Sequence, residues 1–411
     1  MGILLSVVDP LHLLMALVSW ATWPGFVKGM EITLVDIIGL AIYLSLPRTR
    51  TSIPFGVLAA AYLASVVLSV FQSGVPQATM FYAWQLLRVY FLFIVTARAC
   101  ASNDQVAPAL LKGMSIGICL ELCMSIWERF VLGEFQVGGT FGHQNSLGIS
   151  IHFVIYPLFA LWLAGSRGWQ PIVVPIAGIA IALLTASRAT IGLVGAGYAM
   201  TLGLSARLKW TARKGIFAVI GIVLVGVLAP VAFSELSQRG AVSFTADATD
   251  ERTRFENAAA WMLADHPMGI GANTYVVVAN TQGYNQRAGV VPTQGSLTAH
   301  VHNVYRLVAA ETGYFGIVTF VLLLLQPLRV SFVWGWRARG QRTGDLLLGL
   351  GVSLLMVYIH SFYEWILVTF HFQYLLAVNA GMIVGLAQQI GYPRKAGSFK
   401  LAPPNFSESA P

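Results

Sequence analysis

Two histidines stand directly before a long apolar run, where their side chains could take part in proton transfer. The stretch "TAHVHN" places His300 and His302 two residues apart, ahead of a run that begins near Asn303. Imidazole titrates near neutral pH, and a positioned base contributes about 10²–10⁴ in rate. The pair lacks neighbouring cysteines or clustered acids, so it is a weak metal motif. We expect a general base here, whereas a histidine that only caps the helix is the structural alternative.

Three arginines also lie at the borders of apolar segments. Arg188 belongs to "TASRAT", between two apolar runs, while Arg252 and Arg254 open the segment "ERTRFENAAAW". A guanidinium stays charged and can grip phosphate oxygens bidentately. Arg188 and Arg254 together could neutralise a pyrophosphate, and Arg252, on a different helix face, is expected to be solvated or paired with a nearby acid. For Arg188, an arginine that snorkels to the membrane border is the alternative.

The stretch "GGTFGHQNSLGI", residues 138–149, combines glycines with polar side chains before another apolar run. His143 and Asn145 would lie at the start of a helix, where backbone N–H groups attract anions. We expect a phosphate or sugar contact here, although a loop that merely turns the chain explains the glycines equally well.

Further ionisable residues fall within or beside apolar runs. Such groups are functional candidates by default, because a charge in the membrane is costly. For Glu311 we expect a structural role with a partner such as Arg306 or a backbone cap. No role can be assigned from the sequence to the remaining residues, which are Arg88, Glu121, His360, Glu364 and His371.

The whole chain must position these groups within a membrane. Of its 411 residues, 56% are hydrophobic and 10% are charged, and the mean hydropathy is +0.71. Because apolar runs long enough to cross a bilayer recur along the chain, we expect an all-α integral membrane protein with about twelve transmembrane helices. The expected spans are residues 5–23, 31–47, 54–72, 80–97, 106–127, 145–164, 169–186, 189–204, 215–234, 303–325, 345–362 and 366–388.

The distribution of basic residues predicts the orientation of these spans. The net charge of +8 could suggest nucleic acid, but most of the lysines and arginines fall in loops on one side of a twelve-span arrangement. The positive-inside rule therefore places both termini in the cytoplasm and residues 235–302 outside, and we expect no nucleic-acid partner. The minority on the outer side, which needs another explanation, consists of Lys28, Arg129, Arg188, Arg239, Arg252, Arg254 and Arg287.

These features predict one membrane domain over residues 1–392 and a disordered cytoplasmic tail over residues 393–411. The first span lacks a signal-peptide cleavage site and is expected to stay in the membrane. Within the outer segment 235–302, a helix is expected to begin at Thr249 or Asp250 and end before Pro267. Its apolar residues have helical spacing, so it could lie on the membrane surface. The following segment is rich in Gly, Asn, Gln and Thr, which suits contact with carbohydrate.

Four stretches in this order resemble the O-antigen ligase and O-antigen polymerase superfamily of bacterial envelope glycosyltransferases. They are "GTFGHQNSLG", "SRAT", "RFENAAAWMLADHPMGIGANTY" and "HVHNVYRLVAAETGYFGI", and they cover roughly residues 138–320. The resemblance implies an inner-membrane enzyme that uses an undecaprenyl-pyrophosphate-linked glycan at its periplasmic face. It implies neither a metal ion nor a nucleotide sugar, so no cofactor is expected.

Carried over to this chain, the resemblance assigns pyrophosphate binding to Arg188 and Arg254 and the role of base to His302. Because His300 lies two residues away, the identity of the base stays open between the two. An acceptor hydroxyl would attack the anomeric carbon while the pyrophosphate leaves, with the arginines stabilising the developing charge. The candidate substrate contacts are His300, Asn303, Asn145, His143 and Arg252.

Three functions remain open from the sequence. An O-antigen ligase would transfer the glycan to a hydroxyl of lipid A-core, and this is slightly favoured because the single large outer segment leaves an open side for a bulky lipid acceptor. An O-antigen or exopolysaccharide polymerase would transfer it to another lipid-linked repeat unit. A transporter is disfavoured, because carriers often have paired halves with polar sites at the membrane midplane, whereas here the distinctive polar residues lie outside.

Overall fold

The computed structural model describes residues 1–8, 12–16, 30–47, 54–207, 210–221 and 244–393. Residues 394–411, for which we expect a disordered tail, lie outside this description, as do residues 235–243 of the expected outer segment. The helices and strands in this part of the chain are α1 (Gly2–Ser6), β1 (His12–Ala16), β2 (Met30–Thr33), α2 (Leu34–Ser45), α3 (Gly56–Ser69), η1 (Val70–Gln72), α4 (Pro76–Ser102), α5 (Val106–Phe130), η2 (Gly139–Phe141), α6 (Gln144–Leu163), α7 (Gln170–Leu184), α8 (Arg188–Ala206), α10 (Phe244–Asp265), α11 (Tyr275–Thr281), α12 (Tyr284–Arg287), η3 (Ser296–Thr298), α13 (Val304–Arg337), α14 (Arg342–His360), η4 (Ile366–Val368) and α15 (Phe370–Gln389).

The described residues form a helical membrane protein, as expected. Seven of its helices are long and apolar enough to cross a bilayer, namely α4, α5, α6, α8, α13, α14 and α15. Three more apolar helices are shorter, at Leu34–Ser45, Gly56–Gln72 and Gln170–Leu184. The expected span 215–234 lies partly outside the described residues, which are helical over 212–221. The expectation of twelve spans therefore stays a prediction.

The N-terminal region differs from the expected first span, residues 5–23. Helix α1 ends at Ser6, and the strand His12–Ala16 pairs antiparallel with Met30–Thr33. The expected continuous helix is therefore wrong for residues 12–16. Pro10 supplies a physical reason, since proline in a helix interior removes a hydrogen bond and clashes with the preceding turn.

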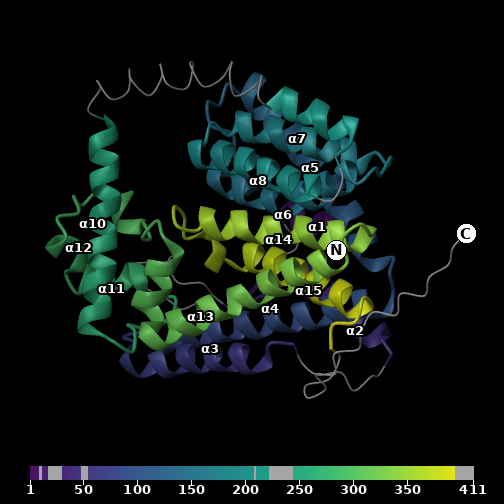
Figure 1. Cartoon of the computed structure of the whole chain (residues 1–411). Coiled ribbons are helices and arrows are strands. Elements are labelled where there is room, and N and C mark those ends of the chain that lie inside the picture. Colours follow the sequence, from purple (N-terminus) through teal and green to yellow (C-terminus); the bar gives the residue numbers. More distant parts are fainter. Residues whose placement is uncertain (9–11, 17–29, 48–53, 208–209, 222–243, 394–411) are drawn as a thin grey trace, which may run out of the picture.

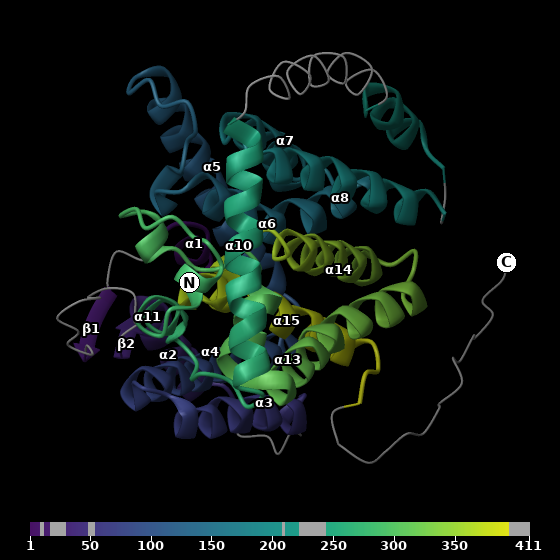
Figure 2. The same cartoon turned by 90° about the vertical axis from the view of Figure 1, so that its left-hand side faces the viewer.

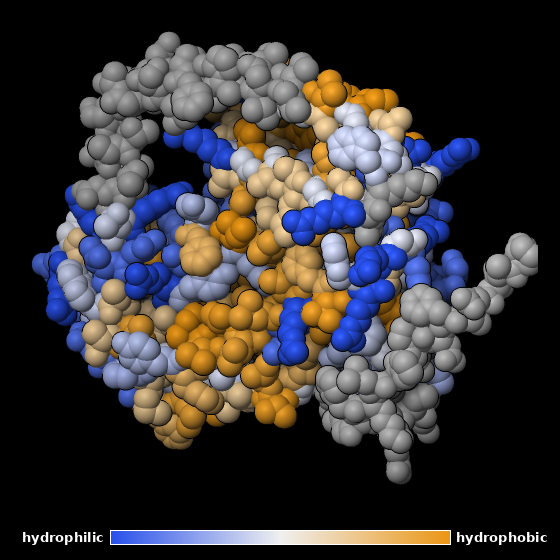
Figure 3. Space-filling view, viewed as in Figure 1, coloured by the Kyte–Doolittle hydropathy of each residue, from blue (hydrophilic) through white to orange (hydrophobic). Residues whose placement is uncertain are grey.

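The bundle helices are stacked in layers that share two ends. Figure 1 shows α5, α7 and α8 on one side, α6, α14 and α15 in the middle, and α3, α4 and α13 on the other side. One end, which we call the α10 end, carries α10, α11 and α12 (Figures 1 and 2). Polar side chains gather around it, whereas apolar side chains cover the middle of the face formed by α3 and α13 (Figure 3). This pattern suits a bundle that crosses a membrane between two polar ends.

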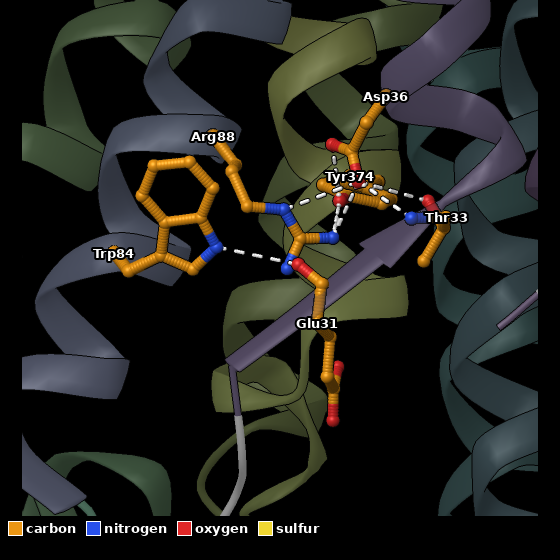
Figure 4. Close-up of polar contacts among 6 residues, drawn as sticks. All are labelled: Glu31, Thr33, Asp36, Trp84, Arg88 and Tyr374. Carbon is orange, nitrogen blue, oxygen red and sulfur yellow. Dashed lines mark hydrogen bonds and ion pairs between the residues drawn. The ribbon is translucent and has the colours of Figure 1, made fainter. Parts of the chain in front are cut away.

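A buried polar cluster attaches the N-terminal elements to the bundle (Figure 4). Arg88 on α4 forms an ion pair with Asp36 on α2 at 2.5 Å, and both contact the hydroxyl of Tyr374 on α15. Asp36 also accepts from Thr33 in a capping box at the start of α2. Because charges within a membrane are costly unless paired, this cluster gives Arg88 a structural role that the sequence left open.

Helix α13 is interrupted at Gly313, whose φ of 72° and ψ of −172° are not helical. The segment after α10 packs into this interruption, where Ile270 N donates to Ala310 O and Tyr314 N donates to Pro267 O. A Cβ atom on Gly313 would lie 2.3 Å from Pro267 O, so only glycine fits. The interruption therefore joins the segment that follows α10 to a membrane helix.

The expected role of Glu311 as a backbone cap is confirmed. Its Oε1 atom accepts hydrogen bonds from the backbone N–H groups of Thr274 and Tyr275, at the start of α11. Orphan N–H groups at a helix start favour an acidic partner of this kind. The buried carboxylate thus fixes α11 to α13.

Helix α10 lies across the ends of the bundle helices (Figures 1 and 2). It ends at Asp265, as expected, but begins at Phe244, earlier than Thr249. Phe255, Ala258 and Met262 on its apolar face are at most 2% exposed. This face therefore packs on the protein itself rather than on lipid, because α11, α12 and α13 already cover it.

Candidate active site

His302 and Glu364 form a polar pair at the α10 end. His302 precedes α13, while Glu364 lies between α14 and α15, and the atoms His302 Nδ1 and Glu364 Oε2 are 3.3 Å apart. The Glu364 side chain is 3% exposed and that of His302 is 30% exposed. A carboxylate on one ring nitrogen holds the imidazole in a fixed orientation and leaves the other nitrogen to exchange a proton.

Asn145 and His143, at the start of α6, complete one side of this pair. The Nδ2 atom of Asn145 donates to Glu364 Oε1, and Asn145 N donates to His143 Nδ1. Burial lowers the pKa of His143, while Glu364 opposes this effect. A neutral His143 suits its role as the hydrogen-bond acceptor that caps α6.

Arg252, on α10, approaches the same carboxylate from the other side. Its Nη2 atom lies 4.0 Å from Glu364 Oε1, and its side chain is 49% exposed. Burial raises the pKa of Glu364, but the hydrogen bond and charge of His302, followed by the charges of Arg252 and His143, outweigh burial and lower that pKa overall. Glu364 therefore remains a carboxylate well into the acid range. Arg252 therefore pairs with an acid, but with one distant in sequence and not with the nearby acid that was expected.

His300 has different surroundings from His302. Its ring stacks on Trp365, with centroids 4.0 Å apart and planes inclined by 16°, and also faces Tyr275. Trp365 directly follows Glu364 in the sequence. The two histidines therefore contact adjacent residues of the segment between α14 and α15. The stacking on Trp365 holds the His300 ring in place, an arrangement that favours support of the site over proton exchange.

Asn303 acts as the N-cap of α13. Its side-chain oxygen accepts from the backbone N–H groups of Tyr305 and Arg306, and the residue is 9% exposed. The next residue, Val304, donates its N–H to Ser361 O, near the end of α14. The cap and this bond set the distance between the segment carrying His302 and the segment carrying Glu364.

Arg188 lies at the first position of α8, next to the start of α6. A Cβ atom on Gly148 would lie 2.1 Å from Thr190 Oγ1, so the first turns of α6 and α8 touch. The turn before Arg188 contains Ala186 with a φ of 51°, which non-glycine residues rarely adopt. Arg188 is exposed, and it makes no hydrogen bond or ion pair with any residue within the described ranges. Its guanidinium is thus available at the same end of the bundle as Asn145.

Arg254 points to a different part of the α10 end. Its Nη1 atom donates to Gly289 O at 2.8 Å, beyond α12. Residues two apart on a helix lie on nearly opposite faces, so Arg252 and Arg254 serve different neighbourhoods. The structure thus brings His302, Asn145, His143 and Arg252 together around Glu364, whereas Arg254 lies on the opposite face of α10.

Two carboxylates of α5 hold the glycine-rich loop before α6. Glu128 Oε2 accepts from Gly138 N and Gly139 N, and Glu121 accepts from Thr140 through both its N–H and its hydroxyl. These N–H groups already have anionic partners within the protein. The loop therefore positions His143 and Asn145 instead of presenting its own backbone to an anion.

Glu364 is the residue of this cluster for which the sequence suggested no role. In the sequence, Glu364 is recognisable only as an ionisable residue between two apolar runs. This position does not indicate which residue it contacts. In the described part of the chain, no group of three or more His, Cys, Asp or Glu side chains could hold a metal ion.

Part of the chain matches a known protein family. Residues 172–321 match the family described as O-antigen ligase, which confirms the resemblance to the O-antigen ligase and polymerase superfamily. The matched region contains Arg188, Arg252 and His302 but neither Asn145 nor Glu364. No curated protein matches this sequence.

Proposed function

Because residues 172–321 carry the O-antigen ligase family pattern, we propose that the protein is an O-antigen ligase-type glycosyltransferase. It transfers a glycan from undecaprenyl pyrophosphate to a hydroxyl of lipid A-core at the periplasmic face of the bacterial inner membrane. The observation that carries this proposal is the His302–Glu364 pair, which is joined by Asn145 and Arg252 at one end of a membrane bundle.

In this proposal His302 is the general base. Glu364 holds Nδ1 of the ring, and Nε2 accepts the proton of the acceptor hydroxyl as its oxygen attacks the anomeric carbon. The bond between that carbon and the pyrophosphate oxygen breaks, and the pyrophosphate leaves with its electron pair. A charged Glu364 stabilises the imidazolium that forms, as a carboxylate does in hydrolase triads. His300, stacked on Trp365, serves to support the site.

The leaving pyrophosphate needs positive charge, which we assign to Arg188 and Arg252. Arg188 is exposed beside the first turn of α6, and the half-exposed Arg252 lies on the Glu364 side of α10. Arginine donors placed where negative charge develops take the part of an oxyanion hole. The sequence favoured Arg254 over Arg252 for binding the pyrophosphate. Because Arg254 donates a hydrogen bond to Gly289, we assign pyrophosphate binding to Arg252 instead.

A reconstituted transfer reaction tests the proposal. Purified protein would receive a synthetic undecaprenyl-pyrophosphate glycan and lipid A-core in the presence of a chelator. We expect glycan-modified lipid A-core from the wild type and a loss of about 10²–10⁴-fold in rate for His302→Ala. His266→Ala, which changes a histidine at the end of α10, is the matched control and keeps the wild-type rate.

The same reaction distinguishes the ligase from its nearest alternative. Product that contains several repeat units on the carrier lipid, without modified lipid A-core, would identify a polymerase instead. Transfer that disappears with the chelator would refute a metal-independent mechanism. Absence of glycan transfer to either acceptor would refute the glycosyltransferase proposal as a whole.

A further inference from the structure

A pocket at the α10 end is lined by none of the residues that surround Glu364. It has a volume of about 510 Å³ and is formed by α11, α12 and the segment leading to η3. Its lining combines side-chain amides of Asn280, Asn285 and Gln286 with aliphatic residues such as Val291 and Pro292. The volume lies within the range of small-molecule sites.

The hydrogen bonds inside this pocket leave an acceptor without a partner. Asn280 Nδ2 donates to the carbonyls of Val276 and Leu297, so its Oδ1 atom must face Asn285. Asn285 Nδ2 donates to that oxygen at 2.9 Å. The Oδ1 atom of Asn285 therefore turns away from Asn280, and it has no hydrogen-bond partner among the described residues although Asn285 is 7% exposed. An unpaired buried acceptor is unfavourable, but this atom has less than 1 Å² of exposed surface, so a ligand donor can pair with it only where the Asn285 amide turns toward the pocket.

The remaining groups define the chemistry of that ligand. The lining residues that the structure describes carry no ionisable side chain, and the guanidinium of Arg254 beside them donates to the carbonyl of Gly289. Gln286 is exposed and adds an amide that can both donate and accept. Val291 is 60% exposed and, with Pro292, offers an aliphatic surface beside the amides. Amides next to an aliphatic surface match an uncharged sugar ring, which has hydroxyl groups on its edge and C–H groups on its faces.

Helix α10 links this pocket to the proposed reaction centre. Arg254 Nη1 donates to the carbonyl of Gly289, which lines the pocket, while Arg252, on the opposite face of the same turn, approaches Glu364. One rigid helical turn thus sets the pocket at a fixed distance from His302. Binding of one sugar of the glycan in the pocket would fix the position of the bond that reacts near His302.

We propose that this pocket, lined by Asn280, Asn285, Gln286 and Val291, is a subsite that binds a neutral sugar unit of the glycan being transferred. The inference rests on the proposed function, because it assigns a glycan substrate to the same end of the molecule. Arg254 is then a positioning residue of the subsite and does not contact the pyrophosphate.

Saturation-transfer NMR tests the subsite independently of catalysis. Full-length protein in nanodiscs would be mixed with the methyl glycosides of glucose, galactose, mannose and N-acetylglucosamine. We expect saturation transfer to at least one glycoside in the wild type. Because each lost contact is worth about 1 kcal/mol, Gln286→Ala and Val291→Ser should each lower the signal by about 5-fold. Both residues are exposed, so these variants retain the fold.

The controls separate failure of the subsite from failure of the proposed function. Gln282→Ala, an exposed glutamine outside the pocket, and His302→Ala should both keep the wild-type signal. Glycoside binding without any glycan transfer would refute the proposed function and support the subsite. Glycan transfer with no glycoside signal, or with the lining variants equal to Gln282→Ala, would overturn the subsite.

Discussion

At the scale of single residues, the surroundings of the two neighbouring histidines are what distinguish them. His302 faces a buried carboxylate, whereas His300 stacks on Trp365 and faces Tyr275. An imidazole oriented by a carboxylate can accept a proton and remain stabilised afterwards. The geometry therefore favours His302 as the base, a choice that the spacing of the two residues left open.

Substitution of Glu364 tests the pairing. Glu364→Gln should lower kcat by about 10–100-fold, the usual effect of removing a carboxylate that orients a histidine. Because the pKa of Glu364 is lowered, the wild-type protein keeps this carboxylate charged as the pH falls. The difference in kcat between the wild type and the Gln variant should therefore persist at neutral pH and narrow only in the acid range, where Glu364 becomes protonated.

The measurement is a pH profile of kcat and KM in the reconstituted reaction. Glu256→Gln, which changes a glutamate of α10 outside the cluster, is the control and should leave the profile in place. A Glu364→Gln variant that loses stability but keeps the wild-type profile would indicate a purely structural carboxylate.

The two arginines of α10 provide a second residue-scale prediction. Arg252→Ala should lower kcat by about 10²–10³-fold, as loss of one donor to a developing oxyanion does. Arg254→Ala should instead raise KM for donors with several sugars and have a smaller effect on kcat, because it supports Gly289. Steady-state kinetics with each variant check both outcomes. A large loss of kcat for Arg254→Ala with only a KM effect for Arg252→Ala would indicate that Arg254 binds the pyrophosphate.

At the scale of elements, the site depends on segments that contact the interruption of α13 or the capped first turns of helices. The strand-like contact of residues 267–271 with the break in α13 joins the end of α10 to a membrane helix. The Asn303 cap and the Glu311 cap fix the segments on either side. Each of these contacts uses a backbone group that a helix end leaves unpaired.

Gly313 is the position at which this arrangement is most sensitive. Gly313→Ala should destabilise the protein by about 1–3 kcal/mol, because its backbone conformation is nearly restricted to glycine, and its Cβ would meet Pro267 O at 2.3 Å. Gly195→Ala on α8 is the matched control, since a Cβ atom there meets nothing within 4 Å and alanine favours a helix. Thermal unfolding in detergent measures both variants. Equal unfolding temperatures for the two would contradict the proposed role of the interruption.

At the scale of the whole molecule, every proposed substrate contact lies at the α10 end. The segments 131–143, 185–187, 266–303 and 361–369 meet there, while the segments 103–105, 164–169 and 338–341 lie at the opposite end with many of the basic residues. The positive-inside rule then predicts that the α10 end faces the periplasm.

Labelling of introduced cysteines checks this orientation. In a background without Cys100, Cys119 and Cys123, Gln282→Cys should react in intact cells with a maleimide that does not cross the inner membrane. Gln341→Cys, an exposed glutamine at the opposite end, should react only after the cells are opened. Labelling of Gln341→Cys in intact cells would reverse the proposed topology.

Local sequence patterns were sufficient to predict the helical membrane class and most long helices, because hydropathy and helix-boundary residues act over short distances along the chain. They were also sufficient to show the resemblance to the O-antigen ligase family, which residues 172–321 match. Prediction from the sequence was wrong about residues 12–16, where pairing with residues 30–33 outweighs local hydropathy. It also led to the expectation that the apolar face of α10 would meet lipid, whereas that face meets other helices.

Only the tertiary structure brought Glu364 to His302, Asn145 to Glu364 and Arg252 to the same carboxylate. Glu364 lies 62 residues from His302 and 219 residues from Asn145 in the sequence. The periodicity of a single helix cannot predict contacts over such separations. Which face of α10 meets which neighbour is likewise set by packing, so the choice between Arg252 and Arg254 depends on the assembled bundle. The chain encodes the chemistry locally, but contacts distant in sequence decide which groups meet.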